Sequence, residues 1–285
     1  MDILRTEGLY KTYNEGSENE VHALKPLDIS IEEGVFYAII GRSGSGKSTL
    51  MQQLNGLLKP TSGQVLLDGV DIWKDKATTR RSRFRVGLVF QYPEYQLFEE
   101  TVYKDIAFGP KNMGLDQKEI EERVGMAADF VGLDRELLDK SPFDLSGGQK
   151  RRAAIAGIIA MRPDVLVLAE PAAGLDPAGR EEILGFAKKL RDENGITVIL
   201  VSHSMEDVAE YVDRIIVMNR GQVAFDGVPK EVFRHHKELE TMGLAAPQVT
   251  YIVEALRAKG FPIGEDITTV EEAKAAILQV VGGKR

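Results

Sequence analysis

Short apolar runs alternate with polar, helix-like segments along most of the chain. Five of these runs are rich in leucine or β-branched residues, are bounded by glycine, proline or charge, and predict buried strands: Val35–Ile40, Val86–Phe90, Val165–Leu168, Thr197–Val201 and Ile215–Met218. Continuous apolar strands of this length are typical of a parallel sheet that is covered on both faces. We therefore expect an α/β core.

Other segments predict a second type of sheet and a helical insert. Leu9–Tyr13 and Leu24–Ile31 alternate like half-exposed antiparallel strands, and Gly221–Asp226 predicts one arm of a late hairpin. Between residues 101 and 161 the strand pattern stops, and apolar residues recur every three or four positions in Gln117–Val131 and Gly147–Met161. We expect this stretch to form a helical subdomain inserted into the α/β core.

The pattern changes again after residue 234. His235 and His236 open a polar stretch, and Pro247 precedes two helical patterns, Gln248–Lys259 and Val270–Val280. We expect a main domain of residues 1–234, with the helical subdomain at about 101–161, and a small C-terminal helical appendage of residues 235–285.

Composition narrows the class of protein. The 285 residues include 44 acidic and 36 basic side chains, which give a net charge of −8 and argue against nucleic acid as a partner. The absence of cysteine excludes disulfides and thiolate metal sites. The least polar stretch, Ala153–Met161, is far shorter than the roughly 20 residues that span a bilayer. Without a visible signal peptide either, we expect an intracellular protein that docks on membrane proteins at most.

The strongest chemical motif follows the first buried strand. Residues 41–48, GRSGSGKS, match G-x-x-x-x-G-K-[ST] in full, between a predicted strand and a helix from about Lys47 to Leu54. Backbone N–H groups in such a loop cradle phosphates, the lysine reaches the β- and γ-phosphates, and the hydroxyl of Ser48 coordinates Mg²⁺. A loop that only caps a helix is the weaker alternative. The candidate phosphate-binding residues are Gly41, Ser43, Gly44, Ser45, Gly46, Lys47, Ser48 and Thr49.

The start of a second predicted helix also has features of a phosphate-binding site, but fewer of them. Ser146, Gly147, Gly148 and Gln149 precede or open the predicted helix Gly147–Met161. Two glycines leave the first-turn N–H groups unobstructed, which suits a second phosphate contact. Ser146 alone is also an ordinary helix N-cap, so the segment by itself fits either role.

Taken in order, these motifs resemble the nucleotide-binding subunit of an ATP-binding cassette (ABC) transporter. The resemblance covers about residues 4–233 and rests on the phosphate loop, Gln91, the LSGGQ segment, a buried strand ending at Glu170, and His203. It implies the P-loop NTPase fold of ABC ATPases: a mixed sheet core, an antiparallel β subdomain, a helical insert and here a small C-terminal α appendage. It also implies ATP and Mg²⁺ as ligands, and two chains paired head to tail, so that Ser146 of one faces Lys47 of the other.

The resemblance assigns further roles residue by residue. Glu170 resembles the general base that polarises the attacking water. Gln91 resembles the glutamine that reaches Mg²⁺ and this water, and His203 the histidine that contacts the γ-phosphate and Glu170. Tyr13 lies where an aromatic ring stacks on adenine, although Tyr10 is equally available.

Asp176 agrees with the family pattern, whereas Ala169 departs from it. Asp176 matches a loop that couples the two sites of a dimer, and before Pro177 it also reads as a helix N-cap. Ala169, by contrast, stands where the family has an aspartate that holds the Mg²⁺ shell opposite Ser48. A methyl group cannot bond metal-bound water, so we expect ATP binding with weakened turnover. The chain is either a substituted form or a naturally weakened member of a heterodimer.

One extended segment points to a particular branch of the family. Four stretches resemble the ATPases of energy-coupling factor (ECF) transporters: Phe90–Val102, Asp105–Asn112, Leu54–Pro60 and Phe225–Pro229. This resemblance implies uptake of vitamins or of cobalt or nickel ions. It also implies four further features: a second ATPase chain, a transmembrane scaffold protein, a separate substrate-binding membrane subunit, and a peripheral position on the cytoplasmic side of the cell membrane. Residues 235–285 would then be a dimerisation extension.

The alternative is a soluble, stand-alone ABC ATPase that acts in translation or DNA repair. Such proteins usually carry two cassettes in one chain or a long coiled-coil insertion, and neither is visible here. The acidic net charge of −8 also argues against DNA or RNA.

Overall fold

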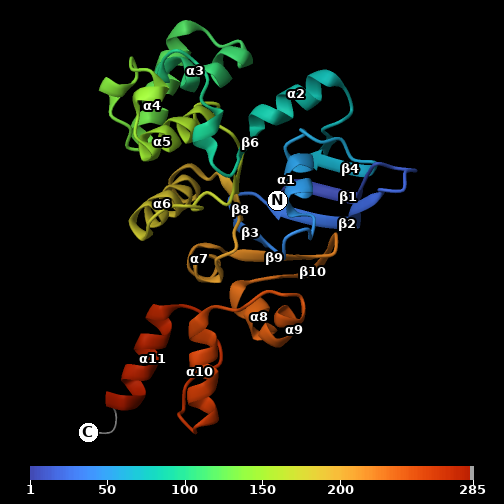
Figure 1. Ribbon diagram of the computed structural model, residues 1–285, viewed down its shortest axis with the longest axis vertical. Coiled ribbons are helices and arrows are strands. Elements are labelled where there is room, and N and C mark those ends of the chain that lie inside the picture. The colour runs from blue at the N-terminus through green and yellow to red at the C-terminus, as the bar shows by residue number, and fades with distance from the viewer. Residues whose placement is uncertain (283–285) are drawn as a thin grey trace.

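A six-stranded sheet forms the centre of the computed structural model, which describes residues 1–282 (Figure 1). Its strands lie in the order β10-β9-β3-β8-β7-β6, and all neighbours from β9 to β6 run parallel, while β10 is antiparallel to β9. The bounds are β3 Phe36–Ile40, β6 Val86–Val89, β7 Val165–Ala169, β8 Thr197–Val201, β9 Arg214–Asn219 and β10 Gln222–Gly227. The five predicted buried strands and the late hairpin arm are confirmed.

An antiparallel sheet of four strands, in the order β2-β1-β4-β5, lies beside this centre. Its bounds are β1 Asp2–Tyr13, β2 Val21–Glu32, β4 Ser62–Leu67 and β5 Val70–Asp71. Strands β1 and β2 are longer than their patterns predict, because register shifts in the pair, such as that between Thr6 and Leu9, interrupt the alternation. The sequence did not reveal β4, whose first three residues are exposed.

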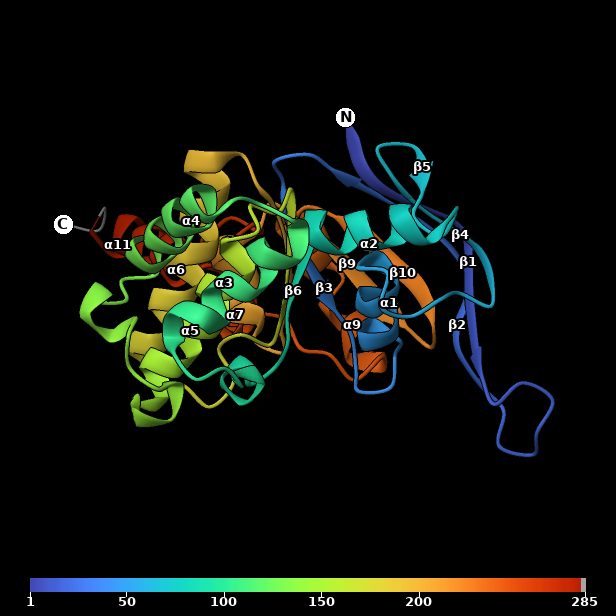
Figure 2. The ribbon, with the colours of Figure 1, turned by 90° about the horizontal axis from the view of Figure 1, so that it is seen from above.

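Helices cover both faces of the six-stranded sheet. The helical insert gathers on one side with α6 and α7, and α1 and α2 lie on the other (Figure 2). The bounds are α1 Lys47–Leu54, α2 Lys76–Arg85, α3 Val102–Met113, α4 Gln117–Phe130, α5 Gly147–Ile159, α6 Pro177–Asn194 and α7 Met205–Tyr211, with short 3₁₀ turns η1 Pro93–Gln96, η2 Arg135–Leu137 and η3 Pro142–Asp144. The predicted helices at α1, α4 and α5 are confirmed.

The core consists of two large apolar clusters separated by the six-stranded sheet. Alternate residues of β3 serve each cluster: Ala38 and Ile40 face the cluster that includes the helical insert, and Tyr37 and Ile39 face the cluster shared with α1 and the four-stranded sheet. Because a strand turns successive side chains to opposite faces, one short apolar strand supplies both layers. The loops at the carboxyl ends of these strands are thereby fixed.

The last four helices are α8 Pro229–Arg234, α9 His236–Thr241, α10 Gln248–Ala258 and α11 Val270–Gly282. Leu239, Leu244 and Ala246 still pack in the large cluster, whereas α10 and α11 form a small cluster of their own around Val253. Packing therefore changes near residue 247, and the domain boundary at residue 234 stays a prediction. No helix within residues 1–282 is long and apolar enough to cross a membrane.

Candidate active site

The phosphate loop joins β3 to α1, and its glycines are required by geometry. Gly46 has a φ of 103°, and a Cβ there would lie 2.7 Å from the carbonyl oxygen of Ala23 and from Leu24 Cδ2. A Cβ on Gly41 would lie 2.4 Å from the carbonyl oxygen of Met218. The loop is thus pressed against the backbone of both sheets, and only glycine fits at these two points.

The start of α1 is prepared for an anion. Gly46 offers no side chain to cap the helix, so the first-turn N–H groups keep their partial positive charge for a ligand. Lys47 Nζ lies beside this turn and donates to the carbonyl oxygens of Gly41, at 2.6 Å, and Arg42, at 3.2 Å. Among the described residues 1–282, the buried hydroxyl of Ser45 finds no hydrogen-bond partner. These groups fit the phosphates of a nucleotide.

Burial also shapes the titration of Lys47. Loss of hydration lowers the pKa of this amine below its ordinary value, while the negative charge of Glu170 acts in the opposite direction. Two carbonyl oxygens are weak partners for a buried ammonium group. A bound phosphate would favour the charged form of Lys47.

Three predicted residues meet at the carboxyl end of β7. Gln91 Nε2 donates to Glu170 Oε2 at 3.0 Å, and His203 Nε2 lies 3.0 Å from Glu170 Oε1. Glu170 itself adopts a left-handed φ of 51°, and its N–H donates to the carbonyl oxygen of Val201 at 2.9 Å. This strained, anchored backbone aims the carboxylate between the loops after β6 and β8.

Ala169 ends β7 and is only 8% exposed. The hydroxyl group that resembles a Mg²⁺ ligand, that of Ser48, belongs to an exposed residue, and Gln91 adds an amide. Glu170 is then the single carboxylate contributed by the end of β7. Across residues 1–282 no group of three or more His, Cys, Asp or Glu side chains is placed to hold a metal ion. Compared with the family pattern described above, the end of β7 therefore carries Glu170 and no second carboxylate.

The two tyrosines proposed for adenine are separated by the structure. The hydroxyl of Tyr13 lies 3.2 Å from Thr49 Oγ1, so the ring stands beside α1. The hydroxyl of Tyr10 instead bonds Thr12 and His22, and neither of these residues belongs to α1. Lys11 Nζ lies 5.4 Å from the centre of the Tyr13 ring. The structure therefore favours Tyr13 as the ring next to a nucleotide.

The Ser146 segment is ordered as a cap in this chain. Ser146 Oγ accepts from the N–H of Gln149 at 3.3 Å, and Gln149 Oε1 accepts from the N–H of Ser146 at 3.0 Å. A Cβ on Gly147 or Gly148 would meet no atom of another described segment within 4 Å, so packing within residues 1–282 does not require glycine there. This segment belongs to the helical insert and lies apart from α1 in both ribbon views (Figures 1 and 2). Asp176 caps α6 by accepting from the N–H of Gly179 at 2.8 Å.

Two arginines beside the site were not predicted: Arg151, which is buried, and Arg180, which is partly exposed. Arg180 pairs with Asp207 and donates to Ser204, which fixes the turn that carries His203. Arg151 contacts the segments after Gln91 and after Glu170. The sequence did hold a signal for Arg151, because it lies four residues before the buried Ile155 and so on the inward face of its helix.

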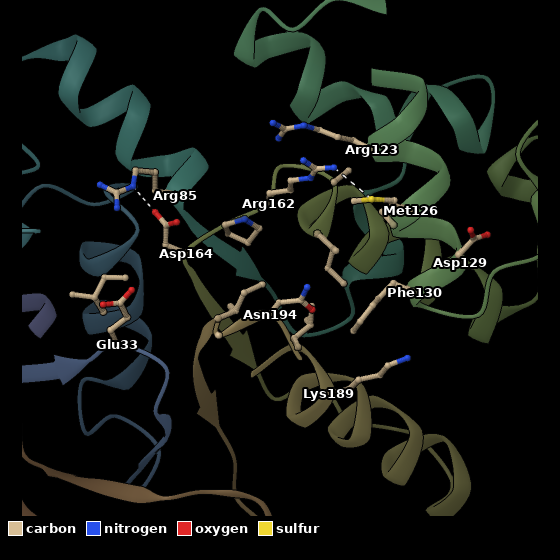
Figure 3. A pocket seen from close by; sticks show the side chains of 18 of the residues that line it. Glu33, Arg85, Arg123, Met126, Asp129, Phe130, Arg162, Asp164, Lys189 and Asn194 are labelled. Carbon is tan, nitrogen blue, oxygen red and sulfur yellow. Dashed lines mark hydrogen bonds and ion pairs between the residues drawn. The ribbon is translucent and has the colours of Figure 1, made fainter. Parts of the chain in front are cut away.

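A separate cavity of about 850 Å³ lies away from these residues, near the amino ends of the parallel strands. Figure 3 shows it between Phe130 and Met126 of the helical insert and the ion pair of Arg85 with Asp164. None of the predicted nucleotide-binding residues lines it. Ligands of open α/β sheets bind at the carboxyl ends of the strands, and this cavity lies at the opposite end from the predicted nucleotide-binding residues.

Comparison with known proteins agrees with this geometry. A family model described as ABC transporter matches residues 24–173. Proteins named energy-coupling factor transporter ATP-binding protein EcfA2 are 54% identical in Caldanaerobacter subterraneus subsp. tengcongensis, over 99% of both chains, and 56% identical in Clostridium acetobutylicum, over 98% of both.

Solved structures agree as well. The structure of cbiO1 from Clostridium perfringens, described as part of the ABC transporter complex cbiONQ, is 42% identical with a TM-score of 0.74 and covers 89% of this chain and 99% of its own. A dimeric post-hydrolysis state of the ATP-binding cassette MJ0796, bound to ADP and Pi, is 30% identical with a TM-score of 0.71 and covers 79% of this chain and 98% of its own.

The fold and the comparisons together define an ABC ATPase, a class of protein that binds ATP. Near-full-length similarity narrows the class further. The chain belongs to the family of energy-coupling factor transporter ATP-binding proteins. It is therefore an ATPase whose hydrolysis of ATP is coupled to transport.

We expect the affinity for ATP to fall as pH rises through the lowered pKa of Lys47 in the free protein, which lies below 10.5, the ordinary pKa of a lysine amine. Burial lowers the pKa of Lys47 in the free protein, and the bound triphosphate raises it, so binding takes up a proton between the two values. Titration calorimetry at stepped pH measures this, with a slope approaching about tenfold per pH unit. In Lys47→Met, which has no amine to titrate, binding is weaker and the slope disappears. The same slope in both proteins would refute the assignment.

We also expect Ala169→Asp to lower the Mg²⁺ concentration that half-activates ATP hydrolysis by about 10–100-fold, because a carboxylate can hold metal-bound water where a methyl group cannot. Ala169→Asn is the matched control, with similar volume and no charge. Hydrolysis is measured over a Mg²⁺ titration with the natural partners present. An unchanged Mg²⁺ requirement and equal rates would contradict the idea that Ala169 weakens the site.

Proposed function

We propose that this chain is one of two ATPase chains mounted on a transmembrane scaffold protein at the cytoplasmic side of the cell membrane. There it powers the uptake of vitamins or transition-metal ions that a separate membrane subunit binds. The observation that carries this proposal is the separation of the phosphate loop from the Ser146 segment within one chain. Two chains paired head to tail bring each loop opposite the partner's copy of that segment. The relative described as part of the complex cbiONQ supports such an assembly.

The proposed chemistry uses the residues that meet at Glu170. With Mg²⁺–ATP as substrate, the phosphate loop and Lys47 hold the phosphates, and Ser48 and Gln91 hold the ion. The ion neutralises charge on the β- and γ-phosphates. Glu170 accepts a hydrogen bond from the attacking water and draws off its proton. His203, 3.0 Å from Glu170, orients the carboxylate and contacts the γ-phosphate. Asp176 is proposed to couple the two sites across the dimer.

An exposed aromatic surface next to Gln91 is the proposed docking site of the scaffold protein. It consists of Tyr92, Tyr95, Phe98 and Phe108, of which Tyr95 is 83% and Phe98 60% exposed. The rings of Phe98 and Phe108 pack edge to face with centroids 5.1 Å apart. A contiguous apolar surface of this kind marks an interaction site. Its position links docking to the segment that carries Gln91.

The C-terminal helices are the proposed second contact between the two ATPase chains. Outward-facing apolar side chains on α10 and α11 are Ile252, Val270, Leu278 and Val281. We propose that residues 235–285 bury these side chains against the second chain. The stand-alone soluble ATPase is not favoured, because the chain matches transporter subunits over nearly its full length.

We expect Glu170→Gln to reduce kcat for ATP hydrolysis by about 10²–10⁴-fold, because the amide cannot accept the proton of the attacking water. Nucleotide affinity stays close to that of the wild type, since the phosphate loop is untouched. Steady-state hydrolysis and binding of a fluorescent ATP analogue measure the two effects. Glu182→Gln, on the surface of α6, is the matched control and keeps normal turnover. Retention of full turnover by Glu170→Gln would remove Glu170 from the proposed role.

The assembly is tested by purifying the tagged chain from detergent-solubilised membranes of its native host and identifying its partners by mass spectrometry. We expect a scaffold membrane protein, a second ATPase chain and small membrane subunits that name candidate substrates. Tyr95→Asp charges the centre of the aromatic surface and should lose the membrane proteins, whereas Val70→Asp, at an exposed position of β5, should keep them. Recovery only in the soluble fraction with ribosomal or repair proteins would favour the stand-alone ATPase instead.

A further inference from the structure

Arg151 is a buried cation at the junction of three functional segments. It lies in α5, five residues after Ser146, and its side chain is only 5% exposed. Removing a guanidinium group from water is costly unless every N–H finds an acceptor. The partners of this side chain therefore explain why an arginine occupies the position.

The first set of partners belongs to the segment after Gln91. Arg151 Nε donates to Glu94 Oε2 at 3.0 Å, and Nη2 donates to Glu94 Oε1 at 2.9 Å. Glu94 lies in η1, and its side chain is 16% exposed. Two parallel bonds of this kind fix the orientation of the carboxylate as well as its distance. The guanidinium also lies 6.0 Å from the centre of the Tyr92 ring.

The second set of partners belongs to the loop that follows Glu170. Arg151 Nη1 donates to the carbonyl oxygens of Pro171, at 3.3 Å, and Ala173, at 3.2 Å, and Nη2 donates to the same oxygen of Ala173 at 3.3 Å. Together with the two bonds to Glu94, these contacts employ the five N–H groups that a guanidinium carries. One side chain thus ties α5, η1 and the loop after Glu170 together.

Stability alone does not account for this arrangement. A buried ion pair gains little over well-packed apolar residues of similar volume, because desolvation offsets the attraction. What the planar guanidinium adds is a fixed geometry among segments that are distant in sequence. Gln91 bonds Glu170 at 3.0 Å and forms a second link between the same two segments. With two separated links, η1 and the loop after Glu170 must move together.

We propose that Arg151 is a positioning residue that transmits displacement of η1 to the loop following Glu170, so that a partner docked on the aromatic surface adjusts the placement of the catalytic carboxylate. Tyr92 and Tyr95 of that surface flank or belong to η1, which brings the docking site to the acceptor end of this link. The inference rests on the proposed function for its input, the docked scaffold. The coupling of η1 to the loop after Glu170 does not depend on the scaffold, because it is inferred from the contacts of Arg151 alone.

The experiment compares Arg151→Lys, Glu94→Gln and the apolar double variant Arg151→Met with Glu94→Met, each in the purified membrane complex. The matched control is Arg152→Lys, because this neighbour pairs instead with Glu182 on α6, at 2.8 Å. Three quantities are measured: kcat and KM with and without the scaffold protein, copurification of the scaffold, and hydrogen exchange of residues 171–176. Thermal melting shows whether each variant is folded.

We expect the Lys and Gln variants to retain the scaffold and a KM near that of the wild type. The part of kcat that depends on the scaffold should fall by about 10–100-fold, the effect of a small misplacement of a catalytic group. Hydrogen exchange should accelerate in residues 171–176, and Arg152→Lys should behave as the wild type. The double variant should melt normally and remain uncoupled, because the apolar pair replaces the packing and not the link.

The contrary outcomes are separate for the two proposals. Normal scaffold stimulation in Arg151→Lys, or full recovery of stimulation in the double variant, would overturn the positioning role and leave the transporter assembly intact. Failure of the wild-type chain to retain any scaffold would overturn the assembly. In that case the link is decided by hydrogen exchange: faster exchange confined to residues 171–176 supports it, and unchanged exchange overturns it.

Discussion

The Glu170 carboxylate is the point on which the arrangement of the site depends. It sits at the end of β7 with a left-handed backbone, is anchored to β8 through Val201, and receives Gln91 and His203 from the loops after β6 and β8. Each of these loops starts from a strand that is buried on both faces. The parallel order β8-β7-β6 therefore delivers three polar side chains to one place without any local sequence motif that connects them.

The phosphate loop packs closely against its neighbours because the groups that an anion site needs are costly to bury without a ligand. An anion site needs uncapped N–H groups and a nearby cation, yet both are costly when buried without a ligand. The chain meets this cost in part, because Lys47 bonds two carbonyl oxygens and Gly46 lies against Ala23 and Leu24. By contrast, Ser146 opens α5 with a complete capping box. The start of α1 thus has no side-chain cap, while the start of α5 is capped within the chain.

Sequence was informative where a short segment decides its own structure. The five fully buried strands and the phosphate loop follow from local composition and spacing, and α1 was predicted with its observed bounds. Strand β4 and helix α2 were missed, because the half-exposed start of β4 and the polar face of α2 carry no apolar period, and long-range contacts hold them. The helical period places Arg151 on the inward face of α5, but the acceptors of Arg151 and Arg180 could not be predicted, since they come from segments distant in sequence.

Ala169 gives the two sites of a pair an asymmetric character whenever the partner chain differs. This chain keeps Ser146, Gly147 and Gly148, so it can complete the phosphate loop of a partner. Beside its own loop, however, Ala169 is an apolar member of the core where the family resemblance implies an aspartate. In a homodimer both sites would contain Ala169, and we expect slow turnover at both. In a heterodimer whose second chain keeps the aspartate, hydrolysis concentrates in the site built from the partner's loop and this chain's Ser146 segment, and the chain's own site serves mainly to hold nucleotide.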